Sequence, residues 1–432
     1  MKVEKLKLKN LKENWIIFLM LAPTVAGIAV FSYVPAIEAV RHSFYRWDGA
    51  FIEEFIGLDN FRRILGNISI WFPLLSGGIL AGLSALIEGK KTIIALRTLA
   101  VIILSWTFFL LYKDTKLFIN SDNGSIDKLT LTFAFLGLAF VCLLFSFKSK
   151  ADKIRNLARF GLFFIPMMAA MHYLIYIRGY GDHILWMSFN LIGILIIANL
   201  FKMWPAIFAA VCIHRLRSEK WKYFYRVLFV IPLIIPQMVG LLIWKFFYDP
   251  NVGPINKILV VTGIDKILMW ADKWIFHLGV FNPPFKPAWL GDPSLIIPAL
   301  IFWGFPWVGV VGVLIYLSGL QNISNDVYEA AEIDGVGWWR RFTSIEFPLI
   351  MTQIRLNLVL MIIGTFQAYG FQLILLGVEG GPRNKGMTPG LYMFFQAFNE
   401  QKYGYACAIG LMLFFIILIL TVINQRYVRI QK

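Results

Sequence analysis

Charged side chains are scarce in this sequence, and acidic ones are the scarcest. Of its 432 residues, 15% are charged and 59% are hydrophobic, with 41 Lys and Arg against 25 Asp and Glu. A soluble domain has roughly a quarter of its residues charged, so this composition argues against a soluble protein. The formal net charge of +16 fits basic residues held on the cytoplasmic side of a membrane. We therefore expect no nucleic-acid partner.

The residue types that build catalytic and metal centres are few and scattered. The three cysteines, Cys142, Cys212 and Cys407, stand singly in or beside apolar runs, without a CxxC or another metal-binding spacing. The five histidines show no pairing. The sequence also has no glycine-rich phosphate-binding loop, so we expect no nucleotide hydrolysis by this chain. We expect neither an enzyme nor a cofactor or metal.

Apolar residues, by contrast, come in runs of about twenty, the length that a helix needs to cross a hydrocarbon core of ~30 Å. We predict an all-α, polytopic membrane protein with ten spanning helices. The first run is long for a secretory signal and shows no convincing cleavage site, so we expect it to remain as a span. The predicted spans lie near residues 15–34, 71–88, 92–111, 129–147, 160–177, 184–212, 226–247, 294–318, 353–376 and 405–423.

Basic residues alternate in density along the connections between these runs. If the N-terminus is inside, ten spans also place the C-terminus inside. The predicted inner connections near 88–91, 148–159 and 214–226 are rich in Lys and Arg, as are both termini. We therefore predict that both termini and residues 322–350 are cytoplasmic. The long outer connection at 248–293 is rich in proline, which predicts short helical pieces there.

A polar stretch, YEAAEIDGVGWWRRFTSIEFPLI at residues 328–350, interrupts the apolar pattern. Residues 322–326 can cap a helix and Gly335 can end it, so we predict a helix over 326–333 that exposes both alanines of the EAA triplet. A second short helix, rich in aromatic residues, should run toward Ile345. By its residues alone, this hairpin also fits an amphipathic connector on the inner membrane surface.

The spacing within the stretch resembles the EAA loop of bacterial ATP-binding-cassette (ABC) importer permeases. Glu-Ala-Ala is followed after three residues by Gly, after nine more by Ile, and after two more by Pro. The matching positions are Glu329, Ala330, Ala331, Asp334, Gly335, Ile345 and Pro348. In that family the loop is a coupling helix in a cleft of the cytoplasmic ATPase. The resemblance implies that these residues couple this chain to a separate ATPase subunit.

The resemblance extends to the sugar-permease branch of these importers. It rests on FLMLAPTVAGIAVFSYVPAIEAVRHSFYRWDG, FIGLDNFRRIL, YFYRVLFVIPLIIPQMVGLLIWKFFYDPNVGPIN and GGPRNKGMTPGLYMFFQAFNEQKYGYACAIG, and it covers roughly residues 10–65 and 182–428. Within the branch, the chain is most similar to subunits for maltose-like oligosaccharides and glycerol-3-phosphate. The resemblance implies a type I ABC importer transmembrane domain with six core helices in a bacterial inner membrane. The implied partners are membrane lipid, a second permease, two ATPase subunits and an extracytoplasmic solute-binding protein.

The sequence departs from this pattern in two places. Residues 66–181 add four apolar runs, which we interpret as an inserted bundle of about four helices that is either a tolerated accessory or a regulatory or partner-docking element. The predicted organisation is therefore 1–65 for the tail, first core span and external segment, 66–181 for the insertion, and 182–432 for the core permease. The second departure is LLGVEGGP, where a Thr-Gly-Gly type of stretch is more usual.

Polar side chains inside the core spans are candidates for the substrate path, because such groups usually face the protein interior or a water-filled route. Amide and hydroxyl groups suit sugar hydroxyls, although hydrogen bonds between helices would explain the same residues. The candidates are Gln367, Tyr369, Gln372, Asn190, Gln237, Asn357 and Asn199. The first three are favoured, because they follow the coupling loop in the next span.

Other function classes fit the residues less well. An intramembrane protease needs a Ser/His or paired-Asp arrangement that the apolar runs do not supply. A secondary transporter would be expected to carry intramembrane charges or broken helices in repeated halves, and no repeat is visible. The sequence therefore favours a permease subunit for a sugar, a related polyol or an oligosaccharide. A secondary transporter, or an importer of a non-sugar solute such as glycerol-3-phosphate, is the alternative.

Overall fold

The computed structural model of the chain describes residues 15–66 and 172–427, with a few isolated positions between them. The chain divides into two compact units, one formed by Met1–Gly57 with Met187–Lys432 and the other by Leu58–Trp186. The predicted spans near 71–88, 92–111 and 129–147, and most of 160–177, lie outside the described residues. In the second unit, α4 (Asp59–Leu65) is described, and the indole N–H of Trp186 donates to the carbonyl of Ile64 at 2.9 Å.

The first span is longer than predicted. Three consecutive helical segments, α2 (Trp15–Ile28), a π-helical turn (Ala29–Tyr33) and α3 (Val34–His42), continue well past residue 34. Pro35 follows the π-helical turn directly, so the wider turn coincides with the residue that cannot donate a backbone N–H. An antiparallel pair follows, with β1 (Tyr45–Trp47) against β2 (Glu53–Phe55).

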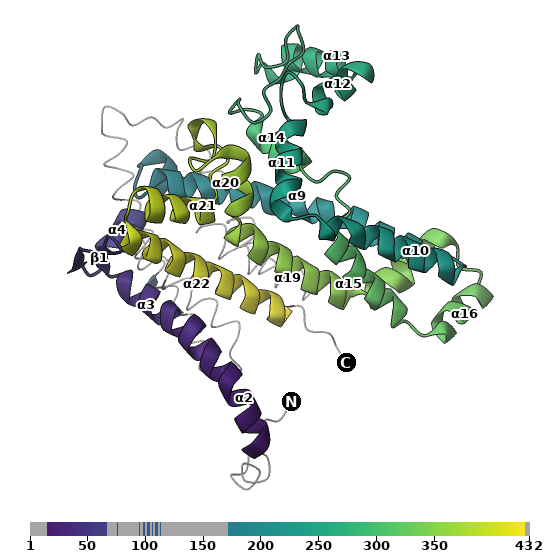
Figure 1. The fold of residues 1–432 in the computed structure, drawn as a ribbon, viewed down its shortest axis with the longest axis horizontal. Helices are drawn as coiled ribbons and strands as arrows, with labels where there is room; N and C mark the ends of the chain where they lie inside the picture. Colours follow the sequence, from purple (N-terminus) through teal and green to yellow (C-terminus); the bar gives the residue numbers. More distant parts are fainter. Residues whose placement is uncertain are drawn as a thin grey trace. The chain divides into compact units, whose positions relative to one another are not determined.

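Two further spans are unbroken and agree closely with the prediction. These are α9 (His183–His214) and α22 (Tyr403–Tyr427), and α22 packs against α3 and β1 (Figure 1). Over the described part of the chain, three helices are long and apolar enough to cross a membrane individually, and two bent pairs raise that number to five. The predicted all-α, polytopic membrane fold is therefore confirmed.

The other three core spans are broken, and the prediction of continuous helices there is wrong. The span predicted at 226–247 is α10 (Glu219–Val230) and a 3₁₀ turn, followed by α11 (Gln237–Phe247) at an angle of 86°. The span predicted at 294–318 is α14 (Ile296–Phe302) and α15 (Val310–Gln321), with residues 303–309 between them. The span predicted at 353–376 is α19 (Met351–Gln367) and α20 (Gly370–Leu376).

Two of the breaks contain proline, and the third contains a hydrogen bond from a residue distant in the sequence. Pro236 and Pro306 lack the backbone N–H that a continuing helix requires, so the first two helices end near them. At the third break, the Thr388 hydroxyl donates to the carbonyl of Ala368 at 2.6 Å, which occupies an oxygen that a continuous helix would use itself. At membrane depth, irregular backbone is tolerated only where protein buries it or where it lines a cavity.

The connection at 248–293, which we predict to lie outside the membrane, forms short helices, as predicted. They are α12 (Pro254–Val261), α13 (Ile264–Ala271) and a π-helical turn (Asp272–Phe276). The Asp272 carboxylate closes the loop after them by accepting the backbone N–H groups of residues 278–281 at 2.6–3.1 Å. These N–H groups, that of Phe281 foremost, hold the pKa of Asp272 below its ordinary value of 3.8.

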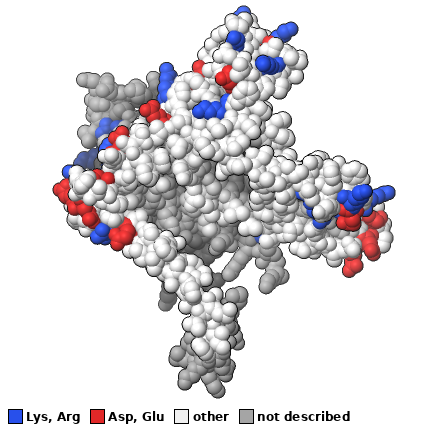
Figure 2. Space-filling model, viewed as in Figure 1, with Lys and Arg blue, Asp and Glu red and all other residues white. Residues whose placement is uncertain are grey.

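The main apolar core joins the last third of α9 to α15 and to the segment that follows the EAA triplet. Its members are Met203, Ala206, Ile207, Ala210, Val211, Ile213, Val313, Tyr316, Leu317, Leu320, Phe342 and Ile350. α15 also packs against α19 and α10 (Figure 1). In Figure 2, charged side chains gather around α10 and α16 (Asn325–Ile333), whereas the surface of the neighbouring apolar helices is largely uncharged. The polar hairpin thus continues directly from a well-packed end of the helix bundle.

Candidate functional site

The EAA triplet lies on α16, a short helix with one buried and one exposed face. The helix runs over Asn325–Ile333, as predicted to within one residue. Ser324 occupies the N-cap position, but its side chain makes no capping hydrogen bond, so capping through that side chain is not observed. Tyr328 and Ala331 are buried, while Glu329 and Ala330 are exposed. The expectation that both alanines are exposed is therefore wrong for Ala331, because it packs inward one position after Ala330.

Gly335 ends α16 in the way its position predicts. Its φ is +64°, in the left-handed region that glycine adopts without steric cost. The N–H of Gly335 donates to the carbonyl of Glu332 at 3.1 Å, and the N–H of Val336 donates to that of Ala331 at 3.0 Å. This pair of bonds is a Schellman motif, which satisfies the last carbonyls of the helix. The chain consequently turns sharply at the exposed end of the hairpin, beside Asp334.

Ile333 completes the exposed face of α16 and was missed by the sequence analysis. Its side chain is 87% exposed, which is unusual for a large apolar residue on a helix with a buried face of its own. It lies four positions after Glu329 and three after Ala330, so the three side chains share one face. The signal available in the sequence was an apolar residue four positions after Glu329, which places it on the same face of the helix.

The second helix of the hairpin is longer than predicted. It runs through α17 (Trp338–Arg341), a π-helical segment (Phe342–Glu346) and α18 (Phe347–Leu349) before a bend of 66° into α19. Ile345 is half-buried, and Pro348 is exposed just after the π-helical segment, two residues before the helix bends at Ile350. Trp338 and Trp339 are both exposed and stack on each other, with ring centroids 6.1 Å apart.

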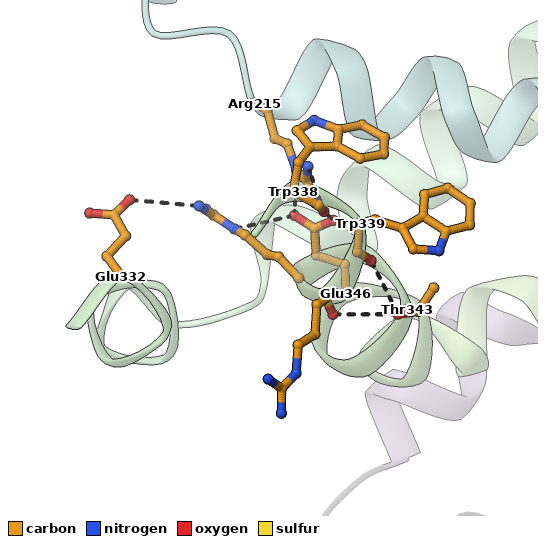
Figure 3. A network of polar contacts seen from close by, with 8 residues as sticks. Arg215, Glu332, Trp338, Trp339, Thr343 and Glu346 are labelled. Carbon is orange, nitrogen blue, oxygen red and sulfur yellow. Dashed lines mark hydrogen bonds and ion pairs between the residues drawn. The ribbon is translucent and has the colours of Figure 1, made fainter. Parts of the chain in front are cut away.

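A buried ion pair fastens this second helix to α9 (Figure 3). Arg215, just beyond the end of α9, donates from Nε and Nη2 to the two carboxylate oxygens of Glu346 at 3.0 and 2.6 Å. The Glu346 side chain is 0% exposed and that of Arg215 is 12% exposed. The same guanidinium donates to the carbonyl of Trp338 at 3.3 and 3.2 Å and lies over its indole ring, 4.4 Å from the centroid. The sequence analysis identified neither partner.

Arg341 connects α16 to this pair. Its guanidinium lies 3.6 Å from the Glu332 carboxylate and 3.8 Å from that of Glu346. It also covers the ring of Tyr328 at 4.3 Å. Burial, together with the nearby Glu346 carboxylate, raises the pKa of the Tyr328 hydroxyl to about 12. Because the phenol therefore stays neutral at physiological pH, the charges in this cluster are those of the arginines and glutamates.

Two of the favoured path residues, and the further candidate Gln237, lie at the ends of the broken helices. Gln367 ends α19, Tyr369 precedes α20 and Gln237 begins α11; all three are exposed, and the Tyr369 ring stacks on Phe394 with centroids 5.7 Å apart. Gln372 is buried at 2% exposure, and its Oε1 has no hydrogen-bond partner among the described residues. Polar groups therefore flank two of the three breaks.

Other path candidates contribute to contacts between helices. The Asn357 amide donates to the hydroxyl of Tyr316 at 2.7 Å, which joins α19 to α15. The Asn199 amide donates to the hydroxyl of Thr365 at 3.1 Å, which joins α9 to α19. Asn190, also on α9, is exposed and takes part in neither of these two contacts. For Asn357 and Asn199, the interhelical interpretation is the one that the geometry favours.

Lys202, within α9, is a charged residue in a predicted span that the sequence analysis did not consider. Its ammonium group contacts the carbonyls of Leu300 and Trp303 at 3.4 and 3.5 Å, at the end of α14. A cation is favourable at a helix C-terminus, where carbonyls lack helical partners. The residue also lines an apolar pocket of about 330 Å³ with Phe201 and Trp307. A lysine in an apolar run was itself the signal, because charges in spans are rare and usually functional.

Broken spans beside polar groups, together with an exposed hairpin at one end of the bundle, define a polytopic helical membrane protein. Residues 202–431 match the family described as the binding-protein-dependent transport system inner membrane component. This match covers more than half of the sequence, so the chain belongs to that family. The predicted resemblance to ABC importer permeases is thereby confirmed.

Individual relatives agree with this assignment. The chain is 31% identical over 245 residues to the probable ABC transporter permease protein YesP of Bacillus subtilis, covering 56% of this chain and 72% of that one. It is 30% identical over 200 residues to the diacetylchitobiose uptake system permease protein NgcF of Streptomyces coelicolor, covering 46% and 51%. It is also 30% identical over 232 residues to the maltose/maltodextrin permease MalF of Photorhabdus laumondii, covering 51% and 40%. The chain thus spans about half the length of NgcF and less of MalF.

The fold is shared with a solved transporter. A chain of a bacterial ABC transporter involved in the import of the acidic polysaccharide alginate superposes with a TM-score of 0.51 at 16% identity. The alignment covers 98% of this chain and 99% of the other. The likeness confirms the predicted type I importer transmembrane fold.

Proposed function

We propose that this chain is a permease subunit of an ATP-driven, binding-protein-dependent importer, and that it forms part of the path for a sugar, a related polyol or an oligosaccharide. The observation that carries the proposal is the exposed face of α16, in a chain of this permease family. The named sugar systems among its relatives support the substrate class. A non-sugar solute such as glycerol-3-phosphate is the alternative cargo, and binding assays on the partner solute-binding protein would distinguish the two.

Coupling to the ATPase would use the face formed by Glu329, Ala330 and Ile333. The small side chain of Ala330 lets the helix backbone approach a groove closely, and Ile333 offers an apolar group that is otherwise left in water. Glu329 supplies a charge for a basic residue of the partner. Asp334 and Gly335 would set the turn that presents this face, Ala331 packs beneath it, and Ile345 and Pro348 belong to the second helix of the hairpin.

The assembly implied by this role contains a second permease subunit, two ATPase subunits and an extracytoplasmic solute-binding protein in a bacterial inner membrane. The dependence on a binding protein is supported by the family description. Both termini and the α16 hairpin would face the cytoplasm, where the ATPase is located. The distribution of Lys and Arg between the inner and outer connections supports this orientation.

The solute path would follow the broken helices. Unwound segments expose backbone carbonyls and N–H groups that can replace the hydration of a polar solute. Gln237, Gln367 and Tyr369 are exposed at two of these breaks and would contribute side-chain hydrogen bonds. Gln372, with an unpaired oxygen close to the third break, is the buried member of this set.

The Glu329→Lys variant tests the proposed coupling. The full-length subunit is coexpressed with the ATPase and permease subunits, and we measure both ATPase copurification and binding-protein-dependent solute uptake. We expect the variant to insert normally but to lose the ATPase and uptake, because a lysine would oppose a basic partner. The matched control is Glu219→Lys, the same charge change at a side chain on α10 that is 79% exposed. Normal uptake by Glu329→Lys would contradict docking through this face.

A further inference from the structure

Motion of the coupling hairpin has two routes to the membrane helices. Along the chain, α16 leads into α19 through a helix that bends by 66° next to Ile350. Across space, the same helix is fastened to α9 by Arg215 and Glu346, which are 131 positions apart in the sequence. The bend divides the route along the chain into two helices, so the contact across space is the candidate for a direct connection between the hairpin and α9.

The Arg215–Glu346 pair is built to hold a fixed geometry. Both carboxylate oxygens of Glu346 accept from one guanidinium, an arrangement that constrains orientation as well as distance. The Glu346 side chain is fully buried, so separating the pair would leave its carboxylate without hydrogen bonds from a guanidinium and with only the longer contact to Arg341. The stacked rings of Trp204, on α9, and Phe347 flank the contact, with centroids 5.6 Å apart. The hairpin and the end of α9 are therefore held together by polar and apolar contacts.

Arg341 extends the connection to the docking helix. It lies between Glu332 of α16 and Glu346, within ion-pair distance of both carboxylates. The alternating charges of Glu332, Arg341, Glu346 and Arg215 form a continuous series from α16 to α9 (Figure 3). A displacement of α16 would therefore be resisted by the end of α9 as well as by the backbone.

At its other contacts, α9 reaches two of the helix breaks. Asn199 donates to Thr365, shortly before α19 ends, and Lys202 contacts the last carbonyls of α14. At 1.5 Å per residue, these side chains lie roughly 20–24 Å along the helix axis from Arg215. α9 remains one helix from Lys202 to its end at His214, although it contains Pro205.

We propose that Arg215 and Glu346 form a buried latch that makes the coupling hairpin and α9 move as one body, so that ATPase-driven movement of α16 reaches the breaks next to Asn199 and Lys202 through α9. The two residues are positioning residues, because they act through α9 and contact no solute. This inference rests on the proposed docking of α16 on an ATPase. It adds a specific transmission element that docking alone does not require.

The first test compares solute uptake with ATP hydrolysis in proteoliposomes that contain the complete transporter. We expect Glu346→Gln and Arg215→Gln to keep the ATPase bound but to lower the number of solutes transported per ATP by roughly tenfold, within the range of typical coupling effects. The double variant Arg215→Gln/Glu346→Gln should assemble at least as well as either single variant, because no unpaired charge remains buried, and yet stay uncoupled. Lys222→Gln, which removes an exposed ion pair on α10, is the control.

A proportional fall in uptake and hydrolysis, or unchanged coupling, would overturn the latch. If the wild-type chain does not copurify with the ATPase subunits, the proposed docking is refuted instead.

A second measurement does not depend on the ATPase. Spin labels at Ile333→Cys and Leu200→Cys, with the native cysteines replaced, should give one narrow distance distribution in the full-length chain and a broad one with Glu346→Gln. An equally narrow distribution in that variant would show that the pair does not hold the hairpin.

Discussion

Gly335 offers the sharpest test of how the hairpin is shaped, because its substitution involves backbone conformation alone. A Cβ at this position would meet nothing within 4 Å, so replacement by alanine creates no clash. The cost comes from the φ of +64°, which is unfavourable for an L-residue by about 1–2 kcal/mol. Alanine also has less freedom than glycine in the opened state, which offsets about 0.4–1 kcal/mol of that cost. The expected net destabilisation of the turn is about 1 kcal/mol.

Amide hydrogen exchange measures this quantity directly. In the full-length chain in nanodiscs, peptides that cover 328–337 should exchange about fivefold faster in Gly335→Ala than in wild type, because the opening equilibrium shifts by about 1 kcal/mol. Gly335→Asn should lie between the two, since asparagine tolerates the left-handed region better.

The matched control for this test is Gly337→Ala. Gly337 also has open space around its Cβ position, but its φ of −66° and ψ of 163° suit any residue. We expect exchange near the wild-type rate in this variant. Equal acceleration in both variants, or none in Gly335→Ala, would refute the assignment of the turn to a left-handed glycine.

Three further predictions follow from the membrane helices and the outer loop. Lys202→Met should leave the melting temperature of the purified chain unchanged or raise it, because placing a lysine in a membrane span costs about 2.5–3.5 kcal/mol on insertion scales. Uptake by the complete transporter should nevertheless fall. Unchanged uptake would show that the ammonium does not support the end of α14. Tyr316→Phe should lower stability by roughly 0.6–1.7 kcal/mol in detergent unfolding, because Asn357 loses its acceptor; Tyr225→Phe, outside the α15–α19 contact, is the control. The loop closed by Asp272 should lose protection from proteolysis as the pH falls below about 4: its pKa is lowered in the folded loop, so the stabilisation is present above the ordinary value of 3.8 and disappears as the carboxylate protonates. Asp272→Asn should remove this pH dependence, and a loop that opens at the same pH in that variant would contradict the assignment.

The accuracy of the sequence analysis varied with the range of the interactions involved. α9 and α22 were located closely, because an uninterrupted apolar run is a local signal that hydropathy detects. The end of α16 was predicted because a glycine after a helical stretch has a local stereochemical meaning. The breaks in the other spans escaped because apolar residues continue through them. Two contain proline, a signal that was present, whereas the break at Ala368 depends on Thr388, which lies 20 positions away.

The polar network around the hairpin could not have been found in the same way. Glu346 appears in the sequence as one acid in a polar loop, and Arg215 as one base in a basic connection. Their burial and their pairing depend on how α9 packs against the hairpin, which single residues do not reveal. The path candidates show the same limit. Asn357 and Gln367 are both polar residues of α19, and the sequence does not distinguish them. In the structure, Asn357 bonds to Tyr316 on another helix, whereas Gln367 is exposed at a break.

The position of Arg215 outside the hairpin has a consequence for exchanging parts between permeases. If residues 322–350 were transplanted alone, Arg341 would travel with Glu346, but Arg215, which makes both hydrogen bonds to the buried carboxylate, would be left behind. The exchangeable module is therefore discontinuous in sequence, comprising the loop together with the end of α9. Chimeras that respect this boundary should fold and couple, whereas those cut at the loop ends should need a compensating basic residue from the host.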